Sequence, residues 1–213
     1  MIVKALILDL DMTLVNTLPK FLSIVIEHAA KYGKRINVSV NYLLSIYYRD
    51  PSLSEVLQEL SNDFQFWHEC WLEYMKKRDY GQVFPRVLDA LRALHDMGKR
   101  LLIATGRELE CWRMTDELRY YGFAQLIEGC VSLGDLGPGH NKRDLIRKAL
   151  DMLGTEPQMT VYVTDHPRDI LMVNGLGTIN IGVATWTNNF PTKLIIRSVA
   201  ELPKVIVKLS RDY

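Results

Sequence analysis

Four short runs of aliphatic and β-branched residues recur along this chain, and they constrain its fold more than any other feature. They occupy residues 2–8, 100–105, 159–165 and 178–184. Runs of this length and composition are typical of strands that are buried on both faces of a sheet. Helical patterns lie between them, most clearly at 85–98 and 141–154. Strands that alternate with helices predict a Rossmann-like α/β fold built on a parallel sheet.

One long segment breaks this alternation, because residues 17–80 contain only helical patterns. We therefore expect an all-helical cap domain, residues 17–80, inserted into an α/β core domain made of residues 1–16 and 81–213. Turn-forming residues cluster at 16–19 and 79–82, where we expect the hinges. The aromatic-rich stretch at 64–75 is predicted to form the core of the insert rather than a platform for stacking nucleic-acid bases.

The overall composition excludes several classes of function. Hydrophobic residues make up 48% of the chain and charged residues 24%, which is typical of a globular protein. The 26 Lys and Arg residues nearly cancel the 25 Asp and Glu residues, so no global charge favours a nucleic acid or a membrane surface. No window approaches the roughly 18 apolar residues of a membrane span. We expect a soluble cytoplasmic protein, and the sequence leaves open whether it is a monomer or a homodimer.

The cysteines give little information about function. The chain has three, at positions 70, 111 and 130, and they are widely spaced. No CxxC pair is present to bind zinc or to perform redox chemistry. We therefore expect all three cysteines to be reduced residues that contribute to packing.

Polar residues follow three of the predicted strands at the point where each strand ends. The carboxyl ends of parallel strands meet at one edge of a sheet, which is where such folds bind their ligands. A lysine at the start of the helix before the third of these strands can reach the same edge. The residues that we expect to gather there are Asp9, Asp11, Thr105, Gly106, Lys142, Asp165 and Asp169.

This set of residues has a chemical logic. Carboxylates that lie close together raise one another's pKa, so they need a cation to remain ionised at neutral pH. Oxygen ligands with open positions suit Mg²⁺, which usually keeps waters and a phosphate in its coordination shell. The hydroxyl of Thr105 and the ammonium of Lys142 are suitable donors to phosphoryl oxygens. Asp9 can attack phosphorus as a nucleophile, and Asp11 can serve as general acid and then as general base.

Four motifs in order carry a resemblance to a known family. They are the DxDxT motif of Asp9, Asp11 and Thr13, a strand ending at Thr105, the helix start at Lys142, and the acidic pair Asp165 and Asp169. With these motifs the chain resembles the haloacid dehalogenase-like hydrolases, and within them the phosphoglycolate phosphatase-like branch with a helical cap.

The resemblance implies a Mg²⁺-dependent phosphatase that hydrolyses a small phosphorylated metabolite through an aspartyl-phosphate. It implies that Asp9, Asp11 and Asp165 hold the metal, Asp11 through its backbone carbonyl, with Asp169 in support. Thr105, Gly106 and Lys142 would bind the phosphate.

The chain departs from the family pattern at several positions. Met12 stands where close relatives usually have glycine, and Thr164 and His166 replace a glycine and a small residue of the fourth motif. The third motif lacks its usual proline after Lys142, which leaves Arg143 and Lys148 as lower-ranked alternatives for the conserved lysine role.

Other functions and plainer roles stay open at this level. The same fold supports a 2-haloacid dehalogenase, a phosphomutase and a binding protein without activity, although carbon–halogen cleavage would not need the acid Asp11. Asp9 and Asp11 could be a solvated strand end, and Asp165 and Asp169 could cap a helix. Arg107 could contact substrate or lie on the surface, and His166 is expected on the surface. Several basic residues of the insert could meet an acidic substrate or face solvent, namely Lys34, Arg35, Arg49 and residues 76–78.

Overall fold

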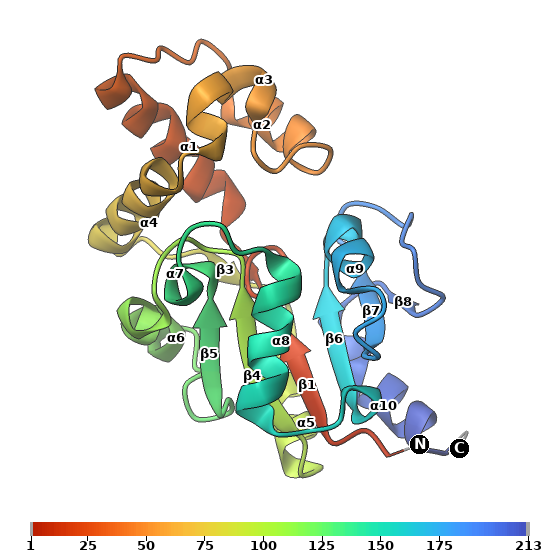
Figure 1. Ribbon diagram of the computed structural model, residues 1–213. Helices are drawn as coiled ribbons and strands as arrows, with labels where there is room; N and C mark the ends of the chain where they lie inside the picture. The colour runs from red at the N-terminus through yellow and green to blue at the C-terminus, as the bar shows by residue number, and fades with distance from the viewer. Residues whose placement is uncertain (1, 212–213) are drawn as a thin grey trace.

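Six strands form the central sheet of the molecule (Figure 1), in the order β5-β4-β1-β6-β7-β8, and every neighbouring pair is parallel. The computed structural model describes residues 2–211. Each of the four predicted strand runs contains one of these strands, but two further strands, of four and two residues, were not predicted. The strands are β1 (Ala5–Leu8), β4 (Arg100–Thr105), β5 (Gly129–Ser132), β6 (Thr160–Thr164), β7 (Ile179–Val183) and β8 (Ile195–Ile196).

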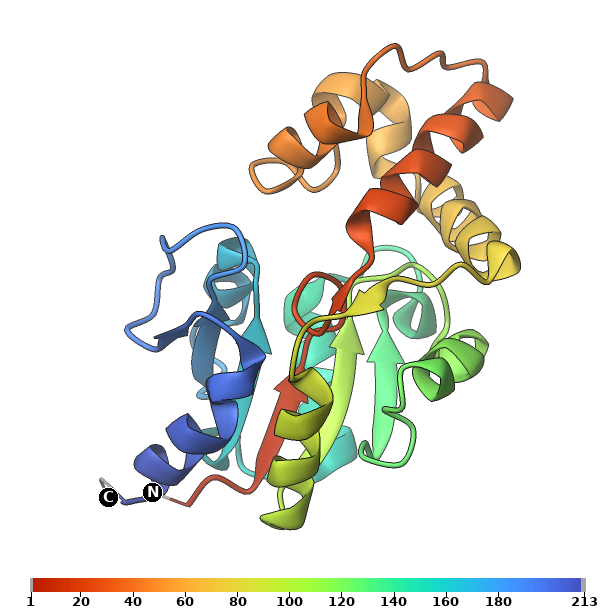
Figure 2. The same cartoon turned by 180° about the vertical axis from the view of Figure 1, so that it is seen from behind.

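Helices cover both faces of this sheet (Figures 1 and 2), which confirms the predicted Rossmann-like α/β fold. Side chains alternate across a strand, so successive residues of β1 enter different cores. Ala5 and Ile7 pack in the core shared with α8, whereas Leu6 and Leu8 pack in the core shared with α5 and α10. The helices of this region are α5 (Val87–Asp96), α6 (Thr115–Tyr120), α7 (Leu133–Leu136), α8 (Lys142–Leu153), α9 (Pro167–Val173) and α10 (Leu202–Arg211).

The start of α8 is fixed by a capping box. The Asn141 side chain accepts hydrogen bonds from the backbone N–H groups of Arg143 and Asp144, at 2.9 Å and 3.4 Å. The Asp144 carboxylate in turn accepts a hydrogen bond from the backbone N–H of Asn141. The capping box lies at the start of the helix predicted at 141–154, and it sets Lys142 as the first residue of that helix.

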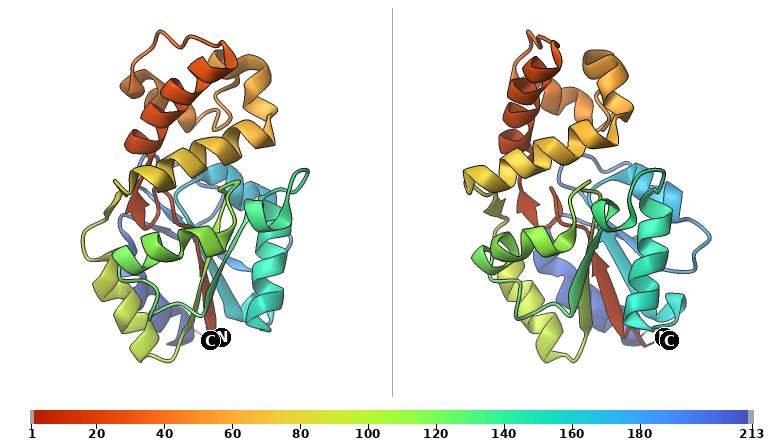
Figure 3. Two further views of the ribbon diagram at one scale, coloured as in Figure 1. Left: turned by 90° about the vertical axis from the view of Figure 1, so that its left-hand side faces the viewer. Right: turned by 60° about the vertical axis from the view of Figure 1, so that its left-hand side comes forward.

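The segment between β2 and β3 contains only helices, and it lies beyond the carboxyl ends of the sheet (Figure 3). We call residues 18–77 the helical unit. The aromatic residues of its last helix, including Trp67, Trp71 and Tyr74, are buried and pack with Phe21, as expected for the core of this segment. Its helices are α1 (Leu18–Ala29), α2 (Val40–Tyr47), α3 (Ser54–Leu57) and α4 (Phe64–Lys77).

Two linkers that run side by side join the helical unit to the sheet region. They begin at the antiparallel pair β2 (Val15–Asn16) and β3 (Gln82–Val83). Gly81 lies so close to the first linker that a Cβ atom on it would be 2.6 Å from the carbonyl oxygen of Asn16. The backbone N–H of Gly81 also donates a 2.8 Å hydrogen bond to the Tyr74 hydroxyl of α4. The linkers are thus tied to each other and to the helical unit.

The expectation of three reduced cysteines is wrong for two of them. Cys111 and Cys130 form a disulfide with Cα atoms 5.8 Å apart, whereas Cys70 is free and buried in α4. The partners are separated by 19 residues, and they meet because the turn at Cys111–Met114 packs beside β5. Nothing in the spacing of the sequence could reveal this packing.

Between residues 2 and 211, no helix has both the length and the apolar character that a membrane crossing requires.

Candidate active site

The carboxyl ends of the three central strands bring the predicted polar residues together. Leu8 at the end of β1 pairs with Ile103 of β4 and with Val163 of β6. The next residue, Asp9, therefore lies between the ends of both neighbours, and its backbone N–H donates to the Val163 carbonyl at 3.0 Å. A cavity of about 590 Å³ opens here, between the sheet and the helical unit. Six of the seven predicted residues line it, namely Asp9, Asp11, Gly106, Lys142, Asp165 and Asp169.

Asp9 has a separate partner for each of its carboxylate oxygens. Lys142 Nζ is 2.6 Å from Oδ1, and the Thr13 hydroxyl donates to Oδ2 at 3.2 Å. Burial raises the pKa of Asp9 to about 6, because it outweighs the attraction of Lys142, and nearby Asp169 acts in the same direction as burial. Asp9 is thus a buried carboxyl that faces the cavity beside a fixed cation.

Asp165 lies beside Asp9 and shares a partner with it. The Thr13 hydroxyl also contacts Asp165 Oδ1 at 2.8 Å, and it accepts a 2.9 Å hydrogen bond from the Asp165 backbone N–H. One hydroxyl therefore connects the first and the fourth motif. Burial raises the pKa of the Asp165 carboxyl well above its usual range, and the charge of Asp9 raises it further.

Lys142 also pairs with Asp169, whose side chain is 18% exposed. Lys142 Nζ lies 3.1 Å from Asp169 Oδ2, and the Tyr162 hydroxyl donates to the same oxygen at 3.1 Å. Burial alone would raise the pKa of Asp169, but Lys142 lowers it more strongly. Burial alone would lower the pKa of Lys142, but Asp169 and Asp9 hold it well above its usual value. The two side chains therefore remain charged together.

Asp11 lies in the opposite electrostatic environment although it is only two residues from Asp9. Arg107 contacts both of its carboxylate oxygens, through Nε at 2.9 Å and Nη2 at 2.8 Å. The hydroxyls of Thr17 and Thr105 donate to it at 2.6 Å and 3.2 Å. Burial would raise the pKa of Asp11, but Arg107 and the two hydroxyls outweigh burial and lower it. Thr105 is fully buried, and its hydroxyl contacts Asp11 rather than the cavity.

Arg107 belongs to a buried network that sequence reasoning missed. The alternative of a surface position is wrong, because its side chain has no exposed area. The guanidinium donates to both carboxylate oxygens of Glu117 in α6, at 2.5 Å and 3.1 Å, and lies over the Trp71 ring at 4.2 Å. Tyr74 of the helical unit also donates to Glu117, at 3.2 Å. A continuous set of contacts therefore runs from Asp11 to α4.

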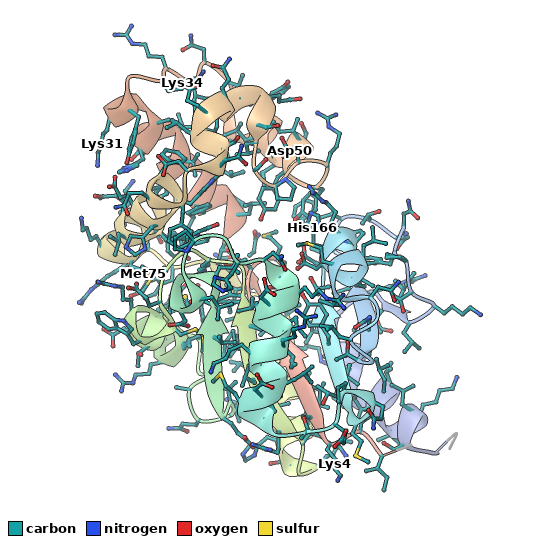
Figure 4. All side chains as sticks on the ribbon, viewed as in Figure 1. Lys4, Lys31, Lys34, Asp50, Met75 and His166 are labelled. Atoms are coloured by element: carbon teal, nitrogen blue, oxygen red, sulfur yellow. A yellow bond between two sulfur atoms is a disulfide. The ribbon has the colours of Figure 1, made fainter. Side chains whose placement is uncertain are left out.

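His166 is not on the surface, so that expectation was also wrong. The residue is only 8% exposed to solvent, and it lines the cavity. Nδ1 accepts a hydrogen bond from the Arg168 backbone N–H at 3.3 Å, which caps α9. Within residues 2–211 the buried Nε2 has no hydrogen-bond partner. The ring stacks at 6.2 Å on Tyr48, which follows α2 of the helical unit, and Figure 4 shows His166 at the top of α9 beneath that unit.

The departures from the family pattern leave the loop geometry in place. Met12 has a φ of 60°, the left-handed conformation that favours glycine, and its side chain is buried. The side chain therefore fits without changing the turn after β1, at an expected cost of about 1 kcal/mol. The Thr164 hydroxyl donates to Asp169 and accepts from the backbone N–H of His166. This residue thus adds a support to the fourth motif that glycine could not provide.

Of the three candidates for the lysine of the third motif, only Lys142 lines the cavity. Arg143 donates to the backbone carbonyls of Met172 and Asn174, at 3.1 Å and 2.7 Å, so it anchors the end of α9. Lys148 is exposed on α8 and does not line the cavity.

The acidic side chains of the site do not form a complete set of magnesium ligands by themselves. Among residues 2–211, no group of three or more His, Cys, Asp or Glu side chains is arranged to hold a metal ion. Asp11 and Asp169 are paired with cations, and Lys142 occupies one oxygen of Asp9, whose other oxygen is joined to Asp165 through Thr13. Mg²⁺ is usually bound by one or two carboxylates, with water and a phosphate as its other ligands. Asp9 and Asp165 therefore suit this ion.

The fold and the buried acids at its carboxyl edge define an α/β enzyme with a carboxylate centre. The family model of the haloacid dehalogenase-like hydrolases matches residues 6–183. The chain therefore belongs to this family, and it is a hydrolase of that type.

Individual proteins of the family show the range of activities on this fold. The chain is 26% identical over 191 residues to the pyrophosphatase PpaX of Bacillus pumilus (strain SAFR-032), covering 87% of this chain and 84% of that protein. A predicted phosphatase from Clostridium acetobutylicum superposes with a TM-score of 0.80 at 19% identity, over 98% of this chain and 100% of the other. A predicted phosphoglycolate phosphatase from Haemophilus somnus 129pt gives 0.74 at 18% identity, over 95% and 97%.

A 2-haloacid dehalogenase from Pseudomonas syringae pv. Tomato DC3000 shares the fold as well, with a TM-score of 0.64 at 23% identity over 98% and 100% of the two chains. The fold places this chain among phosphatases and dehalogenases alike, and the side chains of the site must separate the two.

Proposed function

We propose that this chain is a Mg²⁺-dependent phosphatase that hydrolyses a small phosphorylated metabolite through an aspartyl-phosphate on Asp9. The observation that carries the proposal is the placement of Asp9 at the cavity, with Lys142 on one carboxylate oxygen at 2.6 Å and Asp165 reached through Thr13. Halide leaves without a proton, so a dehalogenase would not need Asp11 as an acid for the leaving group.

Each residue has a distinct task in this reaction. Asp9 attacks phosphorus, so that the Asp9–phosphorus bond forms while the ester bond breaks and the leaving oxygen takes a proton from Asp11. Asp11 then removes a proton from water, the water oxygen attacks phosphorus, and Asp9 is released. Lys142 stabilises the negative charge on the phosphoryl oxygens. Asp9, Asp165 and the backbone carbonyl of Asp11 would hold Mg²⁺, which supplies further charge neutralisation when bound.

The two states of Asp11 are not equally favoured by its surroundings. Arg107 and two hydroxyls lower its pKa, so its ionised form is the stable one. This form is the base that activates water. Uptake of a proton for the first half of the reaction must work against the contacts with Arg107. The arrangement therefore favours the second half of the cycle.

We further propose that the helical unit acts as a cap over the site. It supplies one wall of the cavity and contacts His166 through Tyr48. Closure of such a cap excludes water and selects the substrate. The paired linkers around Gly81 are the place where this motion would be absorbed.

Phosphate release from 4-nitrophenyl phosphate by the purified protein tests this function. We expect turnover with Mg²⁺ and its loss in EDTA. The Asp9→Asn variant should lose at least about 10³-fold in kcat, because it removes the nucleophile. Full activity of Asp9→Asn would reject the mechanism. Halide release from a 2-haloacid in EDTA, without phosphate release, would show that the chain is a dehalogenase.

A further inference from the structure

The cavity above Asp9 has an unusual wall on the side of the helical unit. The residues that the unit contributes are Leu18, Phe21, Tyr47, Pro51, Ser52, Asn62, Trp67 and Trp71. No lysine, arginine or histidine occurs among these described lining residues. A substrate bound in the cavity would therefore meet aromatic rings and neutral polar groups on this side.

Several basic residues of the helical unit are paired with other side chains away from the cavity. Lys34 contacts Gln58, Arg49 lies 3.0 Å from Glu55, and Lys77 lies 2.8 Å from Glu27. Figure 4 shows Lys34 at the end of the unit that lies farthest from the sheet. None of the insert's basic residues named in the sequence analysis, Lys34, Arg35, Arg49 and residues 76–78, lines the cavity. Their proposed contact with an acidic substrate finds no support in this arrangement.

The aromatic part of the wall is held rigid. Phe21 stacks on Trp71 with ring centroids 3.6 Å apart and an angle of 13° between the rings. Trp67 lies 6.1 Å from Phe21 in a similar orientation, and the Arg107 guanidinium supports the other side of Trp71. Because Phe21 and Arg107 cover the two faces of Trp71, these fixed rings present their edges to the cavity. A planar aromatic group can make edge-to-face contacts with such ring edges.

The charges around the cavity disfavour a further anionic group. Carboxyl side chains outnumber permanently cationic ones in its lining by five to three. Arg107 and Lys142 are each shared between two carboxylates. Arg168, which is exposed at the mouth, is the one lining cation without an ion pair among the described residues. The carboxyls are Asp9, Asp11, Glu108, Asp165 and Asp169, and the cations are Arg107, Lys142 and Arg168.

Glu108 brings one of these carboxyls to the aromatic wall. It follows Arg107 directly and lines the cavity, as Trp71 does. Burial raises the pKa of Glu108 to about 7, which reflects how poorly this part of the cavity solvates a negative charge. A second phosphate or a carboxylate on the leaving group would lie near Glu108 and Asp11, where the cation Arg107 is already paired with Asp11 and Glu117.

We propose that the substrate of this site is a phosphate monoester whose leaving group is planar, apolar and free of negative charge. This inference rests on the proposed phosphatase function and names the chemical class of its substrate. It separates this chain from enzymes that act on a pyrophosphate or a phosphoglycolate, because their leaving groups carry a second anionic centre.

Three phosphate esters test this inference: benzyl phosphate, ethyl phosphate and 2-phosphoglycolate. Benzyl and ethyl alcohol are leaving groups of similar basicity, so the difference between their esters reports contact with the wall. We expect benzyl phosphate to exceed ethyl phosphate by about 10-fold or more in kcat/KM, the range of one well-placed apolar group. 2-Phosphoglycolate should be the poorest of the three, and inorganic pyrophosphate should resemble it.

Two variants show whether the wall is the cause. Phe21→Leu keeps an apolar side chain but removes the flat ring, so the ratio of benzyl to ethyl phosphate should fall several-fold. Arg49→Ala, outside the cavity, should leave this ratio unchanged. Loss of the benzyl preference in Arg49→Ala rather than in Phe21→Leu would contradict the assignment of the wall.

The remaining outcomes separate the inference from the function on which it rests. Hydrolysis of 4-nitrophenyl phosphate together with equal values for benzyl and ethyl phosphate would overturn the inference alone. A preference for 2-phosphoglycolate or pyrophosphate that disappears in Arg168→Ala would also overturn it, because the mouth would then bind an anionic group. Failure of every ester would overturn the proposed function and this inference together.

Discussion

Two regions of the site, centred on Asp9 and on Asp11, differ in their partners and in the direction of their pKa shifts, although the two residues are only two positions apart in the sequence. Asp9 lies with Asp165 near one lysine, and its pKa is raised to about 6 by burial. Asp11 has both carboxylate oxygens bound by Arg107, and its pKa is lowered in spite of burial. The partners supplied by the fold, rather than the residue type, set the protonation state of each carboxyl.

The two cations also differ in what they connect. Lys142 holds Asp9 and Asp169 within the sheet region. Arg107 links Asp11 to Glu117, which in turn accepts a hydrogen bond from Tyr74 of the helical unit. We therefore expect the Asp9 region to govern chemistry, and the Asp11 region to govern both proton transfer and the stability of the contact with the helical unit.

Lys142→Ala should reduce activity more than any other substitution of a cation in the two regions. It removes the cation nearest the nucleophile, so we expect kcat/KM for 4-nitrophenyl phosphate to fall about 10²–10³-fold, as for other groups that stabilise developing charge. Lys148→Ala, on an exposed part of the same helix, is the matched control and should retain wild-type kinetics. Equal effects of both substitutions would mean that Lys142 has no special role.

Arg107→Met should destabilise the protein by disrupting the Asp11 region. It leaves Glu117 and Asp11 as buried carboxylates without a cation, which typically costs about 3–5 kcal/mol. At about 2–4 °C per kcal/mol, calorimetry should show a fall in Tm of roughly 10 °C. The exposed ion pair of Arg119 and Asp116 on α6 provides the control, because Arg119→Met should change stability by less than about 1 kcal/mol.

The double variant Arg107→Met/Glu117→Gln sharpens this result. If an unpaired buried charge causes the loss, neutralising Glu117 should recover part of it. A double variant that is less stable by the full sum of two separate losses would show that packing, and not charge, dominates this region.

Asp9→Asn should give a smaller, pH-dependent stabilisation. The folded-state pKa of Asp9 is raised from 3.8 to about 6, so its contribution to stability is fully present below pH 3.8 and is lost as the pH rises through 6. The Tm of the metal-free variant should therefore equal that of the wild type near pH 4 and exceed it by several degrees at pH 7.5. Mg²⁺ should reduce this difference by stabilising the wild type. Asp151→Asn, at an exposed position of α8, is the matched control.

A constant difference in Tm at all values of pH would contradict this account of Asp9. A variant that is less stable than the wild type at pH 7.5 would show that the contact with Lys142 outweighs the cost of burial.

The sequence predicted the Asp9 region far better than the Asp11 region, for a physical reason. Asp9, Asp165 and Lys142 each lie at the end of a strand or the start of a helix, and a parallel sheet must bring such positions to one edge. Glu117 lies in a short helix where it reads as an ordinary solvated charge, and Thr17 reads as part of a linker. Their contacts depend on how α6 and the helical unit pack, which no local pattern encodes.

The same distinction applies to the fold. The strands with long aliphatic runs and the helix predicted at 141–154 follow from local rules, and the structure confirms them. The disulfide between Cys111 and Cys130 and the buried position of His166 depend on tertiary packing, and both expectations failed. Met12 shows a related limit, because its left-handed backbone is imposed by the turn rather than by the residue type.

Trapping of the covalent intermediate tests the central claim most directly. The Asp11→Asn variant lacks the base that activates water, so the phosphoryl-enzyme should accumulate when it reacts with 4-nitrophenyl phosphate and Mg²⁺. After acid quenching and digestion, mass spectrometry should find one phosphoryl group on the peptide that contains Asp9, and none when Asp9 is also replaced by Asn. A phosphoryl group on another residue, or turnover in the Asp9→Asn variant, would contradict the account.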